Sequence, residues 1–161
     1  MSVAASAFLL AGVFAAKPYA DRYADKHLRL LRGARAERDV GEILNALREE
    51  CWVVMHDIEQ PGEGNIDHIA SGPTGVYLVE TKRRRYLDPD LTKAKRQAAK
   101  LHDEIGGVFV TPVICLHSRA GKPFKTHGVW IVPRQELLGW LRSQHNRPAD
   151  PAAIARFAAQ L

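Results

Sequence analysis

Two short apolar segments joined by a turn indicate how the middle of the chain folds. VYLVETK (residues 76–82) is rich in β-branched and aromatic residues, which is typical of a strand. IDHIA (66–70) has the length of a shorter strand, and SGPTG (71–75) between them has the glycine and proline content of a turn. Because the connection is so short, we expect the two strands to pair as an antiparallel hairpin.

The segments around this hairpin alternate between helix and strand signals. A helix is predicted over about residues 34–50, where apolar side chains recur at helical spacing. A second helix is capped by Asp88 or Asp90 and ended by the glycines at 106 and 107. Further strands are predicted at 51–58, 108–117 and 128–133, with loops at 59–65 and 118–126. Closing helices are predicted at 135–142 and from 150 onward. The order expected is therefore α-β-β-β-α-β-β-α-α.

Length and composition favour a single α/β domain. The chain has 161 residues, 46% of them hydrophobic, which suffices for one core. The Arg-rich stretch 29–38 is the clearest change of composition, so we divide the chain into an N-terminal segment, 1–32, and a domain, 33–161. The two cysteines, Cys51 and Cys115, lack the spacing of zinc ligands and are expected to be buried, reduced thiols.

The N-terminal segment has two open interpretations. Residues 1–16 contain no charged side chain, but a membrane-spanning helix needs about 20 apolar residues. The run is therefore either a marginal membrane anchor or a packed helix. Basic residues follow from Lys17 onward, so an inserted run would hold the domain at the inner face of the membrane. Both interpretations predict a cytoplasmic domain.

Three side chains of the hairpin have the chemistry of a divalent-metal site. Side chains alternate along a strand, so Glu80 and Lys82 point to the same face. Asp67 lies on the neighbouring strand, where the turn at 71–75 brings it opposite or diagonal to Glu80. Two converging carboxylates repel each other unless a cation joins them, and hard oxygen ligands suit Mg²⁺ or Mn²⁺. The adjacent lysine ammonium completes a set that processes phosphate.

Each of the three residues also has a plainer explanation. Aspartate is common near turns, and a Glu-x-Lys pair on a strand is often a solvated ion pair of little energetic value. The combination within one hairpin is more specific than any of its members. The sequence contains no GxSxG serine motif, no phosphate loop ending in GK[ST] and no HExxH motif, which argues against those classes of hydrolase.

Beyond the hairpin, the sequence resembles a known family. GARAERDVGEIL, GNIDHIASGPTGVYLVETK and RQAAKL are similar, in this order, to motifs of the nuclease-related domain, abbreviated NERD, of the PD-(D/E)XK nuclease superfamily. The resemblance covers about residues 33–116. It implies an αβββαβ core with a mixed central sheet flanked by helices, and a divalent-metal nuclease site. The site residues that it implies are Glu37, Asp67, Glu80, Lys82 and Gln97.

Helical spacing gives two of these residues an independent basis. Glu37 shares a helix face with Val40, so its carboxylate points to the edge of the core, where an acid needs a cation nearby. The alternative is a charge at the solvated end of the helix. Gln97 shares a face with Ala94, and its amide could bind phosphate, Lys82 or a metal-bound water, or lie at the boundary without a partner.

A basic run follows the strand at a point where the sequence departs from the family. Many members have a neutral or aromatic residue and a glycine after the lysine, whereas this chain has RRRY at 83–86. Guanidinium groups there could hold phosphates and the tyrosine could stack on a base, although such a run is often only a solvated loop. The residues expected to bind nucleic acid are Arg83, Arg84, Arg85, Tyr86, Lys93 and Arg96.

The sequence thus leads to the hypothesis of a cytoplasmic nuclease that depends on Mg²⁺ or Mn²⁺ and hydrolyses phosphodiester bonds, with DNA favoured over RNA. Asp67 and Glu80 are its metal ligands, and Lys82, Glu37 and Gln97 act in catalysis. The net charge of +5 fits an anionic partner. One alternative is a nucleic-acid-binding or membrane-tethered scaffold that keeps the fold without appreciable catalysis. Another is an interaction domain at the membrane.

Overall fold

The computed structural model describes residues 3–159, with side-chain surroundings from residue 22 onward. The chain divides into two compact units between Arg35 and Ala36, and all of the described strands belong to the second unit. Met1 and Ser2, at the start of the expected anchor, lie outside the described residues. Within residues 3–159, no helix combines the length and the apolar character needed to cross a membrane.

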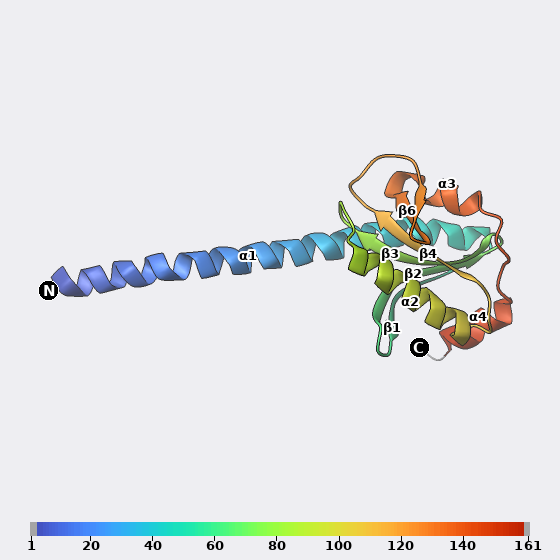
Figure 1. Ribbon diagram of the computed structural model, residues 1–161, viewed down its shortest axis with the longest axis horizontal. Coiled ribbons are helices and arrows are strands. Elements are labelled where there is room, and N and C mark those ends of the chain that lie inside the picture. Colours follow the sequence, from blue (N-terminus) through green and yellow to red (C-terminus); the bar gives the residue numbers. More distant parts are fainter. Residues whose placement is uncertain (1–2, 160–161) are drawn as a thin grey trace. The chain divides into compact units, whose positions relative to one another are not determined.

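The strands of the second unit are β1 (Val53–Gln60), β2 (Gly64–Gly72), β3 (Gly75–Lys82), β4 (Val110–Leu116), β5 (Phe124–Thr126) and β6 (Val129–Pro133). They form one six-stranded mixed sheet in the order β1-β2-β3-β4-β6-β5 (Figure 1). The first three strands pair antiparallel, β4 pairs parallel with β3 and β6, and β5 pairs antiparallel with β6. The helices are α1 (Val3–Asn45), α2 (Asp88–Glu104), α3 (Leu137–Arg142) and α4 (Pro151–Ala158), and short 3-10 helices lie at Ala46–Glu50 and Arg134–Glu136.

The order of these elements confirms the fold expected from the family resemblance. α1, β1, β2, β3, α2 and β4 follow one another along the chain, which is the αβββαβ core. The central sheet is mixed, as expected, because β3 and β4 run parallel after an antiparallel beginning. A crossover through α2 makes this parallel pairing possible, since parallel strands cannot be joined by a tight turn.

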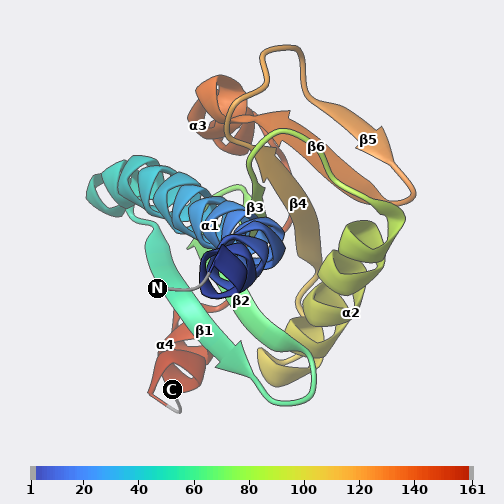
Figure 2. The same ribbon diagram turned by 90° about the vertical axis from the view of Figure 1, so that its left-hand side faces the viewer.

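Helices cover both faces of the sheet (Figure 2). On one face, Val40 and Leu44 of α1 pack in a cluster with Tyr77 and Val79 of β3 and with residues of α3. On the other face, Leu78 of β3 packs with residues of α2 and α4. The side chains of β3 therefore alternate between a face covered by α1 and a face covered by α2, and the first six residues of the strand are buried.

Two predicted loops contain strand residues. Gln60 pairs with Gly64, so most of the predicted loop 59–65 belongs to the β1–β2 hairpin. Gly62 and Gly64 have positive φ angles of 82° and 77°, which allows a turn tighter than the composition suggested. β5 lies within the predicted loop 118–126; it is three residues long and largely exposed, so only its backbone pairing with β6 marks it as a strand.

Two further expectations are corrected. The helix predicted from about residue 34 begins at Val3 and runs on through Pro18 and Gly33, although both residue types disfavour a helix interior. Cys51 is exposed, whereas Cys115 is buried as expected. Cys51 lies at the end of the 3-10 helix with a φ angle of 62°, before β1 rather than inside it, and so misses the core.

The β2–β3 turn is held by close packing between Trp52 and Gly72. Gly72 pairs with Gly75 at the end of the hairpin. A Cβ atom on Gly72 would lie 2.1 Å from Cδ2 of Trp52, a separation that real atoms cannot adopt. Trp52 is 6% exposed and packs near the Tyr77 ring, so it has little room to move. Only glycine therefore fits at position 72.

We expect Gly72→Ala to lower the free energy of unfolding by about 2 kcal/mol or more, because overpacking a filled core forces side chains and backbone to shift. Urea denaturation of the wild type and the variant measures this difference. Gly139→Ala is the matched control, since a Cβ there meets nothing within 4 Å. It should be neutral or stabilising by up to about 1 kcal/mol. Equal effects of the two substitutions would contradict the packing argument.

Candidate active site

An acid and a lysine meet at the carboxyl end of β3. Lys82 Nζ donates to Glu80 Oε1 at 2.8 Å, on the face of the sheet that α2 covers. Glu80 is only 3% exposed, so its charge depends on partners in the protein rather than on water. Glu-x-Lys is therefore a partly buried ion pair here, and not the solvated pair that was the plainer explanation of the motif.

Asp67 of β2 lies across from this end of β3. The last β2–β3 pair is His68 with Val79, and Asp67 and Glu80 are the next residues of the two strands beyond it. The backbone N–H of Thr81 donates to Asp67 Oδ2 at 2.6 Å. Burial, and after it the negative charge of Glu80, raises the pKa of Asp67 to about 7. The charge of Glu80 is thus close enough to disfavour the ionisation of Asp67.

Glu37 reaches the same region from α1. Burial raises the pKa of its carboxyl group, and the negative charges of Asp57 and Glu80 raise it further. The charge of Glu37 in turn adds to the raised pKa of Asp67. Three acids from three elements therefore interact electrostatically, and we call Glu37, Asp67 and Glu80 the site carboxylates.

One stripe of α2 faces the site carboxylates. Asp90, Lys93 and Gln97 recur along it at i, i+3 and i+7. Lys93 Nζ lies 3.3 and 3.2 Å from the two Glu80 oxygens, and Asp90 Oδ1 lies 3.4 Å from Lys82 Nζ. Lys93 is therefore paired with a site carboxylate, whereas the sequence pattern assigned it to the nucleic-acid-binding surface.

Helical spacing contained the signal for this stripe. The spacing sets Gln97 on the inner face of the predicted helix, and Lys93 lies one turn before it, so the same reasoning would have turned Lys93 inward. Asp57 gave no comparable signal. It is exposed in β1 with a positive φ angle of 51°, a local distortion that no strand pattern predicts.

The site contains more acidic groups than ammonium groups. The three site carboxylates face two ammonium groups, those of Lys82 and Lys93. Burial lowers the pKa of Lys82, but its hydrogen bond to Glu80 and the surrounding acids outweigh this effect and raise it. In the described part of the chain, no group of three or more His, Cys, Asp or Glu side chains is arranged to hold a metal ion. The Glu80 carboxylate binds Lys82 and Lys93 instead.

Gln97 is fully buried and holds the turn between β1 and β2. Its Nε2 donates to the carbonyl groups of Glu63, Gly64 and Asn65 at 3.3, 3.3 and 3.0 Å. These three acceptors fix the orientation of the amide. Its Oε1 is buried and has no hydrogen-bond donor among the described residues. Gln97 makes none of its described contacts with Lys82; it reaches the site through the Asn65 carbonyl, which also accepts from Lys93.

A hydrogen-bonded chain supports the site from the opposite face of the sheet. His56 Nδ1 and His68 Nδ1 lie 2.9 Å apart, and His68 Nε2 lies 3.3 Å from Thr81 Oγ1. Burial and the neighbouring His56 lower the pKa of His68 to about 4, so this ring is neutral at pH 7. Gly41 lets α1 approach closely, since a Cβ there would lie 3.3 Å from the His68 ring. This series of hydrogen bonds ends at Thr81, whose backbone N–H donates to Asp67.

The residues assigned to nucleic-acid binding have different surroundings. The three arginines at 83–85 are exposed. Tyr86 is partly buried against a cluster that contains Leu91 and Ile114, so part of the ring that was expected to stack on a base packs against the core. Arg96 is exposed and pairs with Glu63 at 2.9 Å. Within residues 3–159, none of the three arginines forms an ion pair with an acidic side chain.

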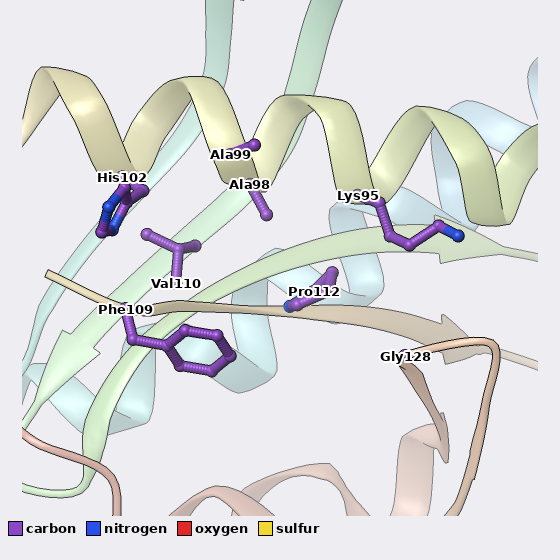
Figure 3. A pocket seen from close by; sticks show the side chains of 8 residues that line it. All are labelled: Lys95, Ala98, Ala99, His102, Phe109, Val110, Pro112 and Gly128. Atoms are coloured by element: carbon purple, nitrogen blue, oxygen red, sulfur yellow. The ribbon is translucent and has the colours of Figure 1, made fainter. Parts of the chain in front are cut away.

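An apolar pocket of about 340 Å³ lies beside α2. Figure 3 shows the side chains that line it. α2 and β4 form its walls, and none of the site carboxylates lines it. His102 supplies the imidazole that lines the pocket, and its Nδ1 is hydrogen-bonded to the Val108 carbonyl at 2.7 Å. The side chains around it include Lys95, Ala98, His102, Phe109 and Pro112.

The sequence matches the family model described as "Nuclease-related domain" over residues 32–117. This match spans more than half of the chain and contains all three site carboxylates together with Lys82 and Lys93. The chain belongs to the nuclease-related domain family. Membership in the NERD family supports a nuclease-type function at the coarsest level. No curated protein matches the sequence significantly.

Two solved structures are similar to this NERD chain. One is described as a repair endonuclease from Pyrococcus abyssi, with 20% identity, a TM-score of 0.37 and coverage of 66% of this chain. The other is described as an EndoMS–dsDNA2 complex, with 16% identity, a TM-score of 0.37 and coverage of 64% of this chain. The matched regions make up 42% and 38% of those chains, so the NERD chain corresponds to less than half of each.

We expect Gln97→Met to lower the free energy of unfolding by about 1–3 kcal/mol, because it removes the donor shared by three carbonyl groups of the β1–β2 turn. Urea denaturation measures the change. Arg96→Ala, on the same turn of α2, is the control; it breaks an exposed ion pair and should cost less than about 1 kcal/mol. Unchanged stability of Gln97→Met would show that the amide does not hold the turn.

Proposed function

We propose that this NERD domain is a divalent-metal-dependent nuclease that hydrolyses phosphodiester bonds of DNA. The observation that carries the proposal is the gathering of Asp67, Glu80 and Lys82 on two adjacent strands: Glu80 is almost fully buried, binds Lys82, and its charge acts on Asp67. Buried acids beside a lysine are costly for stability alone, which favours a role in chemistry.

The residues present fit a hard divalent cation, Mg²⁺ or Mn²⁺. All of the donors are carboxylate oxygens, which these ions prefer, and the site carboxylates outnumber the ammonium groups that face them. Asp67 and Glu80 would hold the ion, with Glu37 beside them. When bound, the ion would polarise a phosphoryl oxygen and lower the pKa of a coordinated water.

The protein's own residues would supply the remaining steps. Lys82 Nζ, held at Glu80, would orient the attacking water and stabilise the charge that develops on the phosphate. The Thr81 N–H holds the Asp67 carboxylate, and His68, from the histidine pair behind the sheet, contacts Thr81. Gln97 would act indirectly, by holding the β1–β2 turn whose Asn65 carbonyl accepts from Lys93.

The substrate would approach across the exposed arginine run. Residues 83–85 follow directly after Lys82, so phosphates bound there lie beside the proposed site. DNA is favoured over RNA, as in the hypothesis drawn from the sequence. One of the similar structures is described as a complex with dsDNA, which is a partner of that other protein. The rival proposal is a nucleic-acid-binding scaffold without turnover, in which the arginines matter and the carboxylates do not.

The nuclease proposal predicts cleavage of labelled DNA with Mg²⁺ or Mn²⁺ and none with EDTA. Glu80→Gln and Asp67→Asn should each lower the rate by about 100-fold or more, because each removes ligand charge while keeping shape. Glu42→Gln, at an exposed position of α1, is the matched control and should cleave as wild type does.

Metal binding can be followed separately from cleavage. Mn²⁺ should raise the melting temperature of the wild type but not of Glu80→Gln or Asp67→Asn, since an ion that binds only the folded state stabilises it. A wild type that binds DNA but cuts neither DNA nor RNA with either ion would replace the nuclease proposal by the scaffold.

Replacing Arg83, Arg84 and Arg85 together by alanine should weaken DNA binding and reduce its dependence on salt, because fewer counterions are released. Titration of a fluorescent DNA duplex at several salt concentrations measures both quantities. The triple variant should lower the slope of log K against log salt by about 1 to 2. An unchanged slope would assign the run to a solvated loop. Cleavage of a saturating substrate should be affected less than binding.

A further inference from the structure

Lys93 holds an unusual position for a surface-helix lysine. Its Nζ contacts both oxygens of Glu80 at 3.3 and 3.2 Å and the Asn65 carbonyl at 3.1 Å. The same Glu80 carboxylate already accepts from Lys82 at 2.8 Å. A single carboxylate of charge −1 is therefore shared by two ammonium groups of charge +1 each.

A divalent ion bound by Glu80 would compete with this arrangement. Such an ion lies about 2.1 Å from its oxygen ligands, so it uses the lone pairs that the ammonium groups occupy here. An ammonium group left within a few Å of the ion would repel it strongly in a buried site. At least one lysine must therefore leave Glu80 when the ion arrives.

The two lysines differ in how firmly they are held. Lys82 is bound on both sides, by Glu80 at 2.8 Å and by Asp90 at 3.4 Å. Lys93 has no carboxylate besides Glu80 among the described residues, and its other partner is a neutral carbonyl. Its side chain is 31% exposed, and its flexible stem begins on α2, outside the sheet. Lys93 can therefore leave Glu80 at a smaller cost in free energy than Lys82.

We propose that Lys93 is an internal counter-ion of the metal site: it occupies Glu80 in the metal-free protein, is displaced by the incoming divalent cation, and then binds a phosphate of the substrate. This inference rests on the proposed nuclease function. A displaced ammonium group beside a metal-bound phosphate has an anionic partner within reach, which offsets the loss of Glu80. Lys93 would thereby couple metal binding to substrate binding.

Mn²⁺ titration of the full chain without nucleic acid tests the first half of the proposal. Lys93→Met keeps the length of the stem and removes the charge, so it should tighten Mn²⁺ binding by about tenfold. Lys95→Met is the matched control, because Lys95 has the same charge on the same helix but lies at the separate apolar pocket. It should change Mn²⁺ affinity by less than about twofold.

The second half is tested with thymidine 3′,5′-bisphosphate, which carries phosphate groups but no phosphodiester bond to cut. Lys93→Met should lose affinity for this ligand, and the loss should be about threefold or more larger with saturating Mn²⁺ than with EDTA. Equal losses in the two conditions would show that Lys93 is not released by the ion, and would overturn this half.

The outcomes separate this inference from the nuclease proposal. Unchanged or weaker Mn²⁺ binding by Lys93→Met, with wild-type binding abolished by Glu80→Gln, overturns the role of Lys93 and leaves the metal site intact. Absence of Mn²⁺ binding in the wild type and in every lysine variant overturns both proposals. If Lys93→Met does not fold, Lys93→Gln takes its place, because its amide can still donate to Glu80 and Asn65 while lacking the charge.

Discussion

The register of the β2–β3 hairpin is the constraint on which the site depends. Gly72 pairs with Gly75, and the pairs follow as far as His68 with Val79, one residue before Asp67 and Glu80. A slip of one residue would turn Asp67 to the α1 face, because side chains alternate along a strand. Trp52 packed on Gly72 fixes the register at the turn, and the bond from Thr81 to Asp67 fixes it at the open end.

Given this register, the charge on Glu80 determines what must surround it. A carboxylate that is 3% exposed requires partners. α2 supplies Lys93 directly, and Asp90 of α2 anchors the second partner, Lys82. The apolar residues of α2 dock it on the sheet and set its polar stripe at the margin of the core. The way α2 docks on the sheet therefore determines both which apolar residues it buries and which charged groups surround Glu80.

The site also draws on both faces of the sheet. α1 contributes Glu37 and the close approach at Gly41, which leaves room for the two histidine rings against the back of β2 and β3. The His68 ring contacts Thr81, the residue between Glu80 and Lys82. Asp67 is thus positioned by a chain of contacts that begins on the face away from α2. Substitutions on the α1 face should be able to affect the site without touching it.

The sequence by itself determined the αβββαβ order, the hairpin, and the shared face of Glu80 and Lys82, because hydrophobic period and strand alternation are local properties. It also supplied Glu37, Asp67 and Gln97 as site candidates through the motifs of the family. Only the tertiary structure decided how these groups are partnered. Four contacts depend on where α1 and α2 dock on the sheet: Lys93 binds Glu80, Gln97 holds a turn, Tyr86 packs inward and His68 supports Thr81. This docking is set by long-range packing that no single segment encodes.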